Sequence, residues 1–292
     1  MEKKRNPKEY GMLVAKGMAM GASDVVSGVS GGTIAFITGI YEELLDSIKS
    51  INTSNLKLLF TGKIRTFWKN INANFLVALV SGIGISIFSL AKIITWLLEF
   101  HPMVVWPFFF GLVLASTWVV AKEVTQWNWK TILYFLAGAI IAYYITAATP
   151  KEQAENLSLL FVFISAMIAI CAMILPGISG SFILVLLGAY KYVMEAVKNL
   201  DILVILVFVC GAFLGITSFA RLLSFALKHY HNTTLSILAG FMLGSLNKVW
   251  PWKNPVTEVN ILPDHFVWQG FGLMIIGFCL VYFLDKLSSK EA

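Results

Sequence analysis

Two short stretches rich in glycine and serine have the residue types of an anion-binding site. One is SGVSGGTIAFITGIY at residues 27–41, and the other is PGISGSFILVLLGAY at residues 176–190. In each, small residues precede an apolar segment, so free backbone N–H groups and the positive end of a helix would face into the protein. Serine and threonine hydroxyls add donors, a combination typical of phosphate or carboxylate sites. The candidate ligands are Gly28, Ser30, Gly31, Gly32, Thr33, Gly177, Ser179, Gly180 and Ser181.

Three ionisable residues in or beside apolar segments are further candidates. Lys92 and Arg221 carry charges that are expensive in a membrane unless they meet a partner or a cavity. Either could contact the same anion, although snorkelling of these long side chains toward the membrane surface is the alternative. Asp24 precedes the first stretch and could balance basic residues, take up a coupling proton or cap a helix. The sequence leaves these three roles open.

The composition indicates an all-α polytopic membrane protein. Of the 292 residues, 58% are hydrophobic and 13% are charged, whereas soluble domains carry roughly 25% charged residues. Several apolar runs are near 20 residues long, enough to cross a bilayer. The cysteines have no metal-ligand spacing, so we expect no cofactor or metal. The net charge of +6 suits basic loops and indicates no nucleic-acid partner. No pattern in the sequence indicates the oligomeric state.

The apolar segments fall into two sets of five. Residues 1–156 contain a hairpin at about 10–48 and spans at about 74–98, 102–121 and 130–149. Residues 157–292 contain a hairpin at about 157–198 and spans at about 202–228, 233–249 and 266–284. The hairpin arms have about 16–19 residues, which barely cross the hydrocarbon core. We therefore expect each half to be a re-entrant or short helical hairpin followed by three transmembrane helices.

The two halves resemble each other in sequence. The glycine-serine stretches align at a constant offset of 149, and GLVLAST at residues 111–117 aligns with GFMLGSL at residues 240–246 at an offset of 129. The second offset also places Lys92 on Arg221. A hairpin returns to the side it left, and three spans follow, so each half crosses the membrane an odd number of times. This parity predicts two inverted-topology repeats, the usual plan of secondary transporters.

The distribution of basic residues predicts that both termini are cytoplasmic, because cytoplasmic loops are enriched in lysine and arginine. The side that holds the termini would carry Lys3, Lys4, Arg5, Lys8, Lys49, Lys57, Lys63, Arg65, Lys69, Lys122, Lys130, Lys228, Lys286 and Lys290. The opposite side would carry Lys151, Lys191, Lys198, Lys248 and Lys253.

The stretches GMAMGASDVVSGVSGGTIAFITGIYEELLDSI and ILPGISGSFILVLLGAY resemble the PopT family of bacterial polyprenyl-phosphate translocases. The resemblance covers essentially the whole chain. It implies a flippase of the bacterial plasma membrane that returns undecaprenyl phosphate from the outer to the cytoplasmic leaflet, where envelope precursors are rebuilt on it. Inward movement of a negative charge opposes an inside-negative membrane potential. Proton coupling, with Asp24 as the carrier, is therefore our hypothesis.

Two alternatives use the same anion-binding physics. A secondary transporter of a small soluble anion would need a closed aqueous path, which the sequence does not address. A membrane undecaprenyl pyrophosphate phosphatase is disfavoured. The loop PGISGS resembles a loop of those enzymes, but Gly180 stands where their PGxSRSG pattern has arginine. No paired glutamates of their ExxxE type lie in the apolar segments. We therefore expect a transporter and no enzymatic activity.

Overall fold

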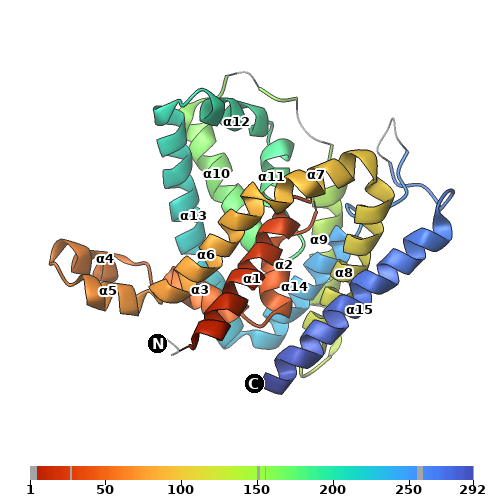
Figure 1. Ribbon diagram of the computed structural model, residues 1–292, viewed down its shortest axis with the longest axis horizontal. Coiled ribbons are helices and arrows are strands. Elements are labelled where there is room, and N and C mark those ends of the chain that lie inside the picture. Colours follow the sequence, from red (N-terminus) through yellow and green to blue (C-terminus); the bar gives the residue numbers. More distant parts are fainter. Residues whose placement is uncertain (1–4, 27, 150–151, 155, 255–258, 292) are drawn as a thin grey trace.

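The computed structural model describes residues 5–26, 28–149, 152–154, 156–254 and 259–291, which form helices α1 to α15 (Figure 1). Ser27, which opens the first glycine-serine stretch, lies outside these ranges. The first half contains α1 (Pro7–Asp24), α2 (Gly31–Ile37), α3 (Tyr41–Lys49), α4 (Thr53–Phe60), α5 (Ile64–Asn70), α6 (Ala73–Phe88), α7 (Leu90–Phe100), α8 (Pro102–Lys122) and α9 (Trp129–Ala147). The second half contains α10 (Leu159–Ile174), α11 (Gly180–Leu186), α12 (Tyr190–Lys198), α13 (Ile202–His229), α14 (His231–Ser245) and α15 (Val267–Glu291).

The helices confirm a multi-pass membrane protein. Within the described ranges, four helices are long and apolar enough to cross a bilayer: α8, α9, α13 and the part of α15 at Val267–Lys286. Two bent pairs, α5 with α6 and α11 with α12, raise the number to six if each pair is one span. The N-terminal end of α1 and the C-terminal end of α15 lie at the same end of the bundle (Figure 1).

The second arm of each hairpin is broken at a glycine, where the sequence suggested one continuous apolar segment. The chain turns at Gly39, with φ of 69°, between α2 and α3, and at Gly188, with φ of 73°, between α11 and α12. Glycine adopts this left-handed conformation without the steric cost that other residues meet. At the second break the two helices are bent by 111°. Each hairpin thus ends in a short helix beyond a glycine turn, and in the second hairpin this helix is set at a steep angle to its arm.

The expected span at 74–98 is also divided, into α6 and α7. The break lies at Ser89, whose hydroxyl donates a hydrogen bond to the carbonyl of Ile85 at 2.6 Å. A serine that bonds back to the preceding turn competes with the helix ladder and bends the helix. The residues between the first hairpin and α6 form α4 and α5, which stand beside the bundle (Figure 1).

The bundle is built from four closely packed helix pairs: α1 with α6, α10 with α13, α8 with α15, and α9 with α14. The pairs approach closely because small residues face a neighbouring backbone, as is common between membrane helices. A methyl group added at Gly277 of α15 would lie 2.1 Å from the carbonyl oxygen of Phe108 in α8. A methyl group at Gly82 of α6 would lie 2.1 Å from the carbonyl oxygen of Val14 in α1.

The contact between α8 and α15 gives a testable prediction. Gly277→Leu should destabilise the protein by about 1–3 kcal/mol, because the new side chain must push the two helices apart. Gly272→Leu on the same helix is the matched control, since a methyl group there meets nothing within 4 Å. Thermal unfolding in detergent or nanodiscs measures both. Equal midpoints for the two variants would contradict this packing.

Candidate functional site

The turns of the two hairpins contact each other deep in the bundle. The hydroxyl of Ser30 donates to the carbonyl of Met173 at 2.8 Å, and the N–H of Gly177 donates to the hydroxyl of Thr33 at 3.1 Å. The phenol of Tyr41 donates to the carbonyl of Ile174 at 3.1 Å. All three side chains are buried. Side chains of the first hairpin therefore satisfy backbone groups that the end of α10 leaves without helical partners.

The two turns have the same local form. Helices α2 and α11 begin at Gly31 and Gly180, which are 149 residues apart, and both helices contain 7 residues. In each turn the glycine that precedes this helix by three residues has positive φ, 92° at Gly28 and 90° at Gly177. The shared sequence pattern thus folds into a shared backbone conformation.

The N–H groups of the first turn are occupied by side chains of the same hairpin. The N–H of Gly31 donates to a carboxylate oxygen of Asp24 at 2.7 Å, and the N–H of Gly32 donates to the hydroxyl of Ser30 at 3.0 Å. A methyl group added at Gly31 would lie 2.8 Å from the other oxygen of Asp24. Of the three roles considered for Asp24, this geometry is that of a helix cap. Its carboxylate lies where an external anion would otherwise approach the backbone.

The second turn is arranged differently. Met173 stands at the position equivalent to Asp24, and a methyl group at Gly180 would lie 3.2 Å from its Cβ. No side chain caps the start of α11 among the described residues. The hydroxyls of Ser179 and Ser181 lie 2.8 Å apart and bond to each other. The second turn therefore keeps backbone N–H groups that no side chain of its own hairpin occupies.

Lys248, which follows α14, lies against both turns. A methyl group added at Gly28 in the first turn would lie 2.8 Å from its Cγ. Its ammonium nitrogen lies 4.6 Å from the ring centroid of Phe182, directly after Ser181 in the second turn. The side chain is half-buried. We did not expect Lys248 at the site, because its sequence neighbourhood is that of an ordinary loop and only the tertiary fold brings it to the turns.

The structure does not bring Arg221 and Lys92 to the turns. Arg221 is exposed on α13 and donates to the carbonyl of Ile51 at 3.4 Å, near the start of α4. Lys92 is exposed on α7. Their roles as ligands stay predictions.

A charged cluster beside Arg221 fastens α3 to α13. The carboxylate of Asp46 accepts from Ser224 at 2.9 Å and forms an ion pair with Lys228 at 2.9 Å. Lys49 donates to the hydroxyl of Ser224 at 3.2 Å. Partial burial raises the pKa of Asp46, but the hydrogen bonds from Lys228 and Ser224 and the nearby positive charges outweigh burial and lower it below its ordinary value. These contacts therefore favour the charged form of the carboxylate that joins the two helices.

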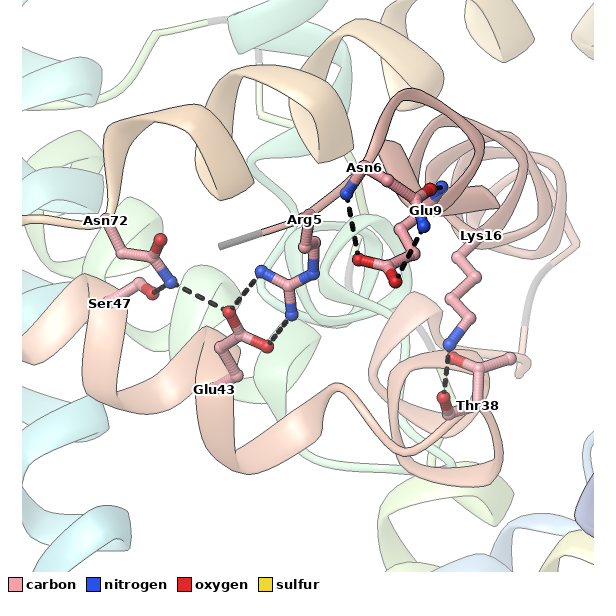
Figure 2. A network of polar contacts seen from close by, with 8 residues as sticks. All are labelled: Arg5, Asn6, Glu9, Lys16, Thr38, Glu43, Ser47 and Asn72. Atoms are coloured by element: carbon pink, nitrogen blue, oxygen red, sulfur yellow. Dashed lines mark hydrogen bonds and ion pairs between the residues drawn. The ribbon is translucent and has the colours of Figure 1, made fainter. Parts of the chain in front are cut away.

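The first hairpin is positioned by a polar network on its other side. Figure 2 shows Glu43 of α3 between two partners. It forms a bidentate ion pair with Arg5, at 2.8 and 2.5 Å, and accepts from the side-chain amide of Asn72 at 2.8 Å. Lys16 of α1 donates to the carbonyl of Thr38, beside the break at Gly39, at 2.7 Å. These contacts tie α2 and α3 to α1 and to the start of α6, and so hold the first turn in position.

The fold and these turns define a class: a multi-pass helical membrane protein whose two polar hairpin turns meet inside the bundle. No group of three potential His, Cys, Asp or Glu metal ligands occurs in the described part of the chain. Residues 20–262 match the model of the VCA0040-like family, described as undecaprenyl phosphate translocase-like. The chain belongs to this family, which confirms the resemblance noted in its sequence.

Two relatives carry the name polyprenyl-phosphate transporter. The protein from Vibrio cholerae serotype O1 is 50% identical over 297 residues, covering 94% of this chain and 96% of the relative. The protein from Staphylococcus aureus is 31% identical over 296 residues, covering 95% of this chain and 97% of the relative. No solved structure matches the chain. The family and both relatives are named for transport and not for an enzymatic reaction.

The hydrogen bond between the two turns gives a testable prediction. Thr33→Val keeps the shape of the side chain and removes the acceptor for the N–H of Gly177. We expect a loss of about 1–3 kcal/mol of stability, because a buried N–H is left without a partner. Thr38→Val is the control, since the Thr38 hydroxyl bonds only to the carbonyls of Ile34 and Ala35 in its own hairpin arm. Thermal unfolding that is unchanged in Thr33→Val would contradict this role.

Proposed function

We propose that the protein is a flippase for undecaprenyl phosphate and returns it from the outer to the cytoplasmic leaflet of the bacterial plasma membrane. The names of the family and of its relatives support a lipid phosphate as substrate. The observation that carries the proposal is the meeting of the two hairpin turns, with the side chain of Lys248 against both. Backbone N–H groups, hydroxyls and an ammonium group there have the chemistry that binds a phosphate.

The two halves act in this proposal as inverted repeats, residues 1–156 and 157–292, with both termini cytoplasmic. The equal lengths of α2 and α11 and the matching φ angles at Gly28 and Gly177 support the repeat. The basic residues on the side of the termini support the orientation. Rocking of one repeat against the other would then expose the turns to each leaflet in turn.

Each proposed ligand has a place in this cycle. The backbone N–H groups and serine hydroxyls of the two turns, with Lys248, hold the phosphate near the middle of the membrane. Arg221 and Lys92 are equivalent residues of the two repeats and would contact the phosphate on opposite sides of the turns. Arg221 would contact the phosphate on the cytoplasmic side, where α3 packs against α13. Lys92 would contact it on the outer side.

Transport by purified protein in vesicles tests this proposal. Lys248→Gln should slow transbilayer movement of undecaprenyl phosphate about tenfold to a hundredfold, because a hydrogen bond to a charged group contributes roughly 1.5–3 kcal/mol. Lys130→Gln, which removes an exposed charge at the start of α9, should leave the rate unchanged.

The outcomes separate the candidate functions. Equal rates for the Lys248→Gln and Lys130→Gln variants would show that Lys248 does not bind the phosphate. Vesicles that take up inorganic phosphate, and leave the lipid where it was, would favour a transporter of small soluble anions. Phosphate released from undecaprenyl pyrophosphate would favour a phosphatase.

We further propose that a proton moves with the lipid phosphate. Carrying one negative charge against an inside-negative potential costs about 2.3 kcal/mol per 100 mV, and a phosphate monoester carries between one and two such charges. Asp24 is the proposed carrier, because its carboxylate holds the N–H of Gly31 at the first turn. Protonation would release this N–H for the phosphate.

Asp24→Asn tests the coupling, because the amide has the shape of the acid but carries no titrating proton. In wild-type vesicles, inward movement should accelerate under an imposed pH gradient and slow when an uncoupler collapses it. In Asp24→Asn vesicles, the rate of inward movement should change under neither treatment. A wild-type rate that is insensitive to the gradient and to the uncoupler would rule out proton coupling.

A further inference from the structure

An apolar cavity of about 600 Å³ lies beside the second turn. Its walls come from α10, α11, α12 and α13, and Ile87 at the end of α6 adds one more side. This volume falls within the range of about 300–1,000 Å³ in which proteins bind small molecules and cofactors. The lining is almost wholly apolar, and Gly180 and Ser181 of the second turn border it. The cavity is therefore a hydrocarbon chamber that adjoins the second turn.

The cavity is open on the side where α12 and α13 face outward. Met194 and Val197 of α12 and Val209 of α13 line it and are about half exposed. Ser181, which borders the cavity at the second turn, is exposed. A long apolar chain could thus enter sideways from the bilayer and reach the turn without crossing water.

The corresponding region of the first half is closed. There α3 packs directly against α13, through the contacts of Asp46 with Ser224 and Lys228. The space left between these helices, bordered by Asp46 and Lys228, measures about 10 Å³, about the least that a single water molecule requires. In the second half, the cavity separates α12 from Ile87 of α6. The two halves are thus in contact where α3 meets α13, whereas a lateral chamber lies open between α12 and α6.

We propose that this cavity holds the isoprenoid chain of a polyprenyl phosphate, with the phosphate end at Gly180 and Ser181. The inference rests on the proposed function and adds the binding site for the tail. Four of the lining residues are alanines, at positions 166, 169, 196 and 212. Their small side chains leave width in the cavity for a chain with methyl branches. The part of the chain that exceeds the cavity would leave through the opening between α12 and α13 and remain in the bilayer.

The cavity borders the turn at which the proposed function places the phosphate. A lipid held in the cavity by its chain would therefore have its phosphate at the second turn.

A matched pair of tryptophan variants on α13 tests the site by transport. Val209→Trp fills the cavity and should slow movement of undecaprenyl phosphate about tenfold, because added bulk cannot be accommodated beside the chain. Leu206→Trp is the control, since Leu206 lies one turn away, is not part of the lining and is equally exposed, 56% against 54% for Val209. Val209→Ala, which enlarges the cavity, should keep the wild-type rate and shows that position 209 tolerates substitution.

Photo-crosslinking tests occupancy directly. Wild-type protein in vesicles is irradiated with a polyprenyl phosphate that carries a diazirine on its isoprenoid chain, and the labelled peptides are identified. We expect label on the lining segments of α12 and α13, removed by excess undecaprenyl phosphate and not by excess phospholipid. Label spread evenly over outward-facing helices such as α9, or displaced by phospholipid, would overturn the inference.

The two proposals fail in different ways. If wild-type protein moves no lipid phosphate, the flippase proposal is wrong, and the crosslinking pattern still decides whether the cavity binds the chain. If wild type moves the lipid and Val209→Trp moves it as fast as Leu206→Trp does, the cavity is not the tail site, whereas the flippase proposal stands.

Discussion

The architecture depends on one constraint: a polar turn inside a membrane protein must find partners for its backbone groups, because no water is available there. This chain contains two such turns, and the first one supplies partners for the second. Ser30, Thr33 and Tyr41 bond to the backbone at residues 173–177. The requirement for satisfied backbone groups therefore draws the halves of the chain together at the point where both hairpins reverse.

The remaining elements hold the turns at that meeting point. Close glycine contacts lock the helix pairs that carry the hairpins, and the network around Glu43 fixes the first hairpin to α1 and α6 (Figure 2). The two turns differ in which backbone N–H groups are already bonded to a side chain. Asp24 occupies the N–H of Gly31, whereas the start of α11 has no side-chain cap among the described residues and adjoins an open apolar cavity. Similar backbones thus acquire different chemistry through a few sequence differences, among them Asp24 in the first half and Met173 in the second.

Much of the fold could be predicted from the chain alone. Apolar segment length located α8, α9 and α13 to within a few residues, because each must supply enough apolar residues to cross the hydrocarbon core. Helix α15 continues to Glu291, beyond the expected end at residue 284. The breaks were not anticipated. Ser89 divides an apolar run through one hydrogen bond, and Gly39 and Gly188 bend arms that read as continuous. Hydrophobicity is insensitive to such local changes of backbone direction, since the residues on both sides of a break remain apolar.

The sequence by itself determined the class of protein, the family and the paired glycine-serine turns, because composition and local motifs depend only on neighbours along the chain. Tertiary structure alone decided which side chains meet at those turns. Lys248 reaches Gly28 and Phe182 from a distant loop, and Arg221 contacts Ile51 instead of the turns. The cavity beside Ser181 likewise lies between helices that are distant in sequence, with Ile87 of α6 facing α12 across it. Such relations follow from how the helices pack, which spacing along the chain does not encode.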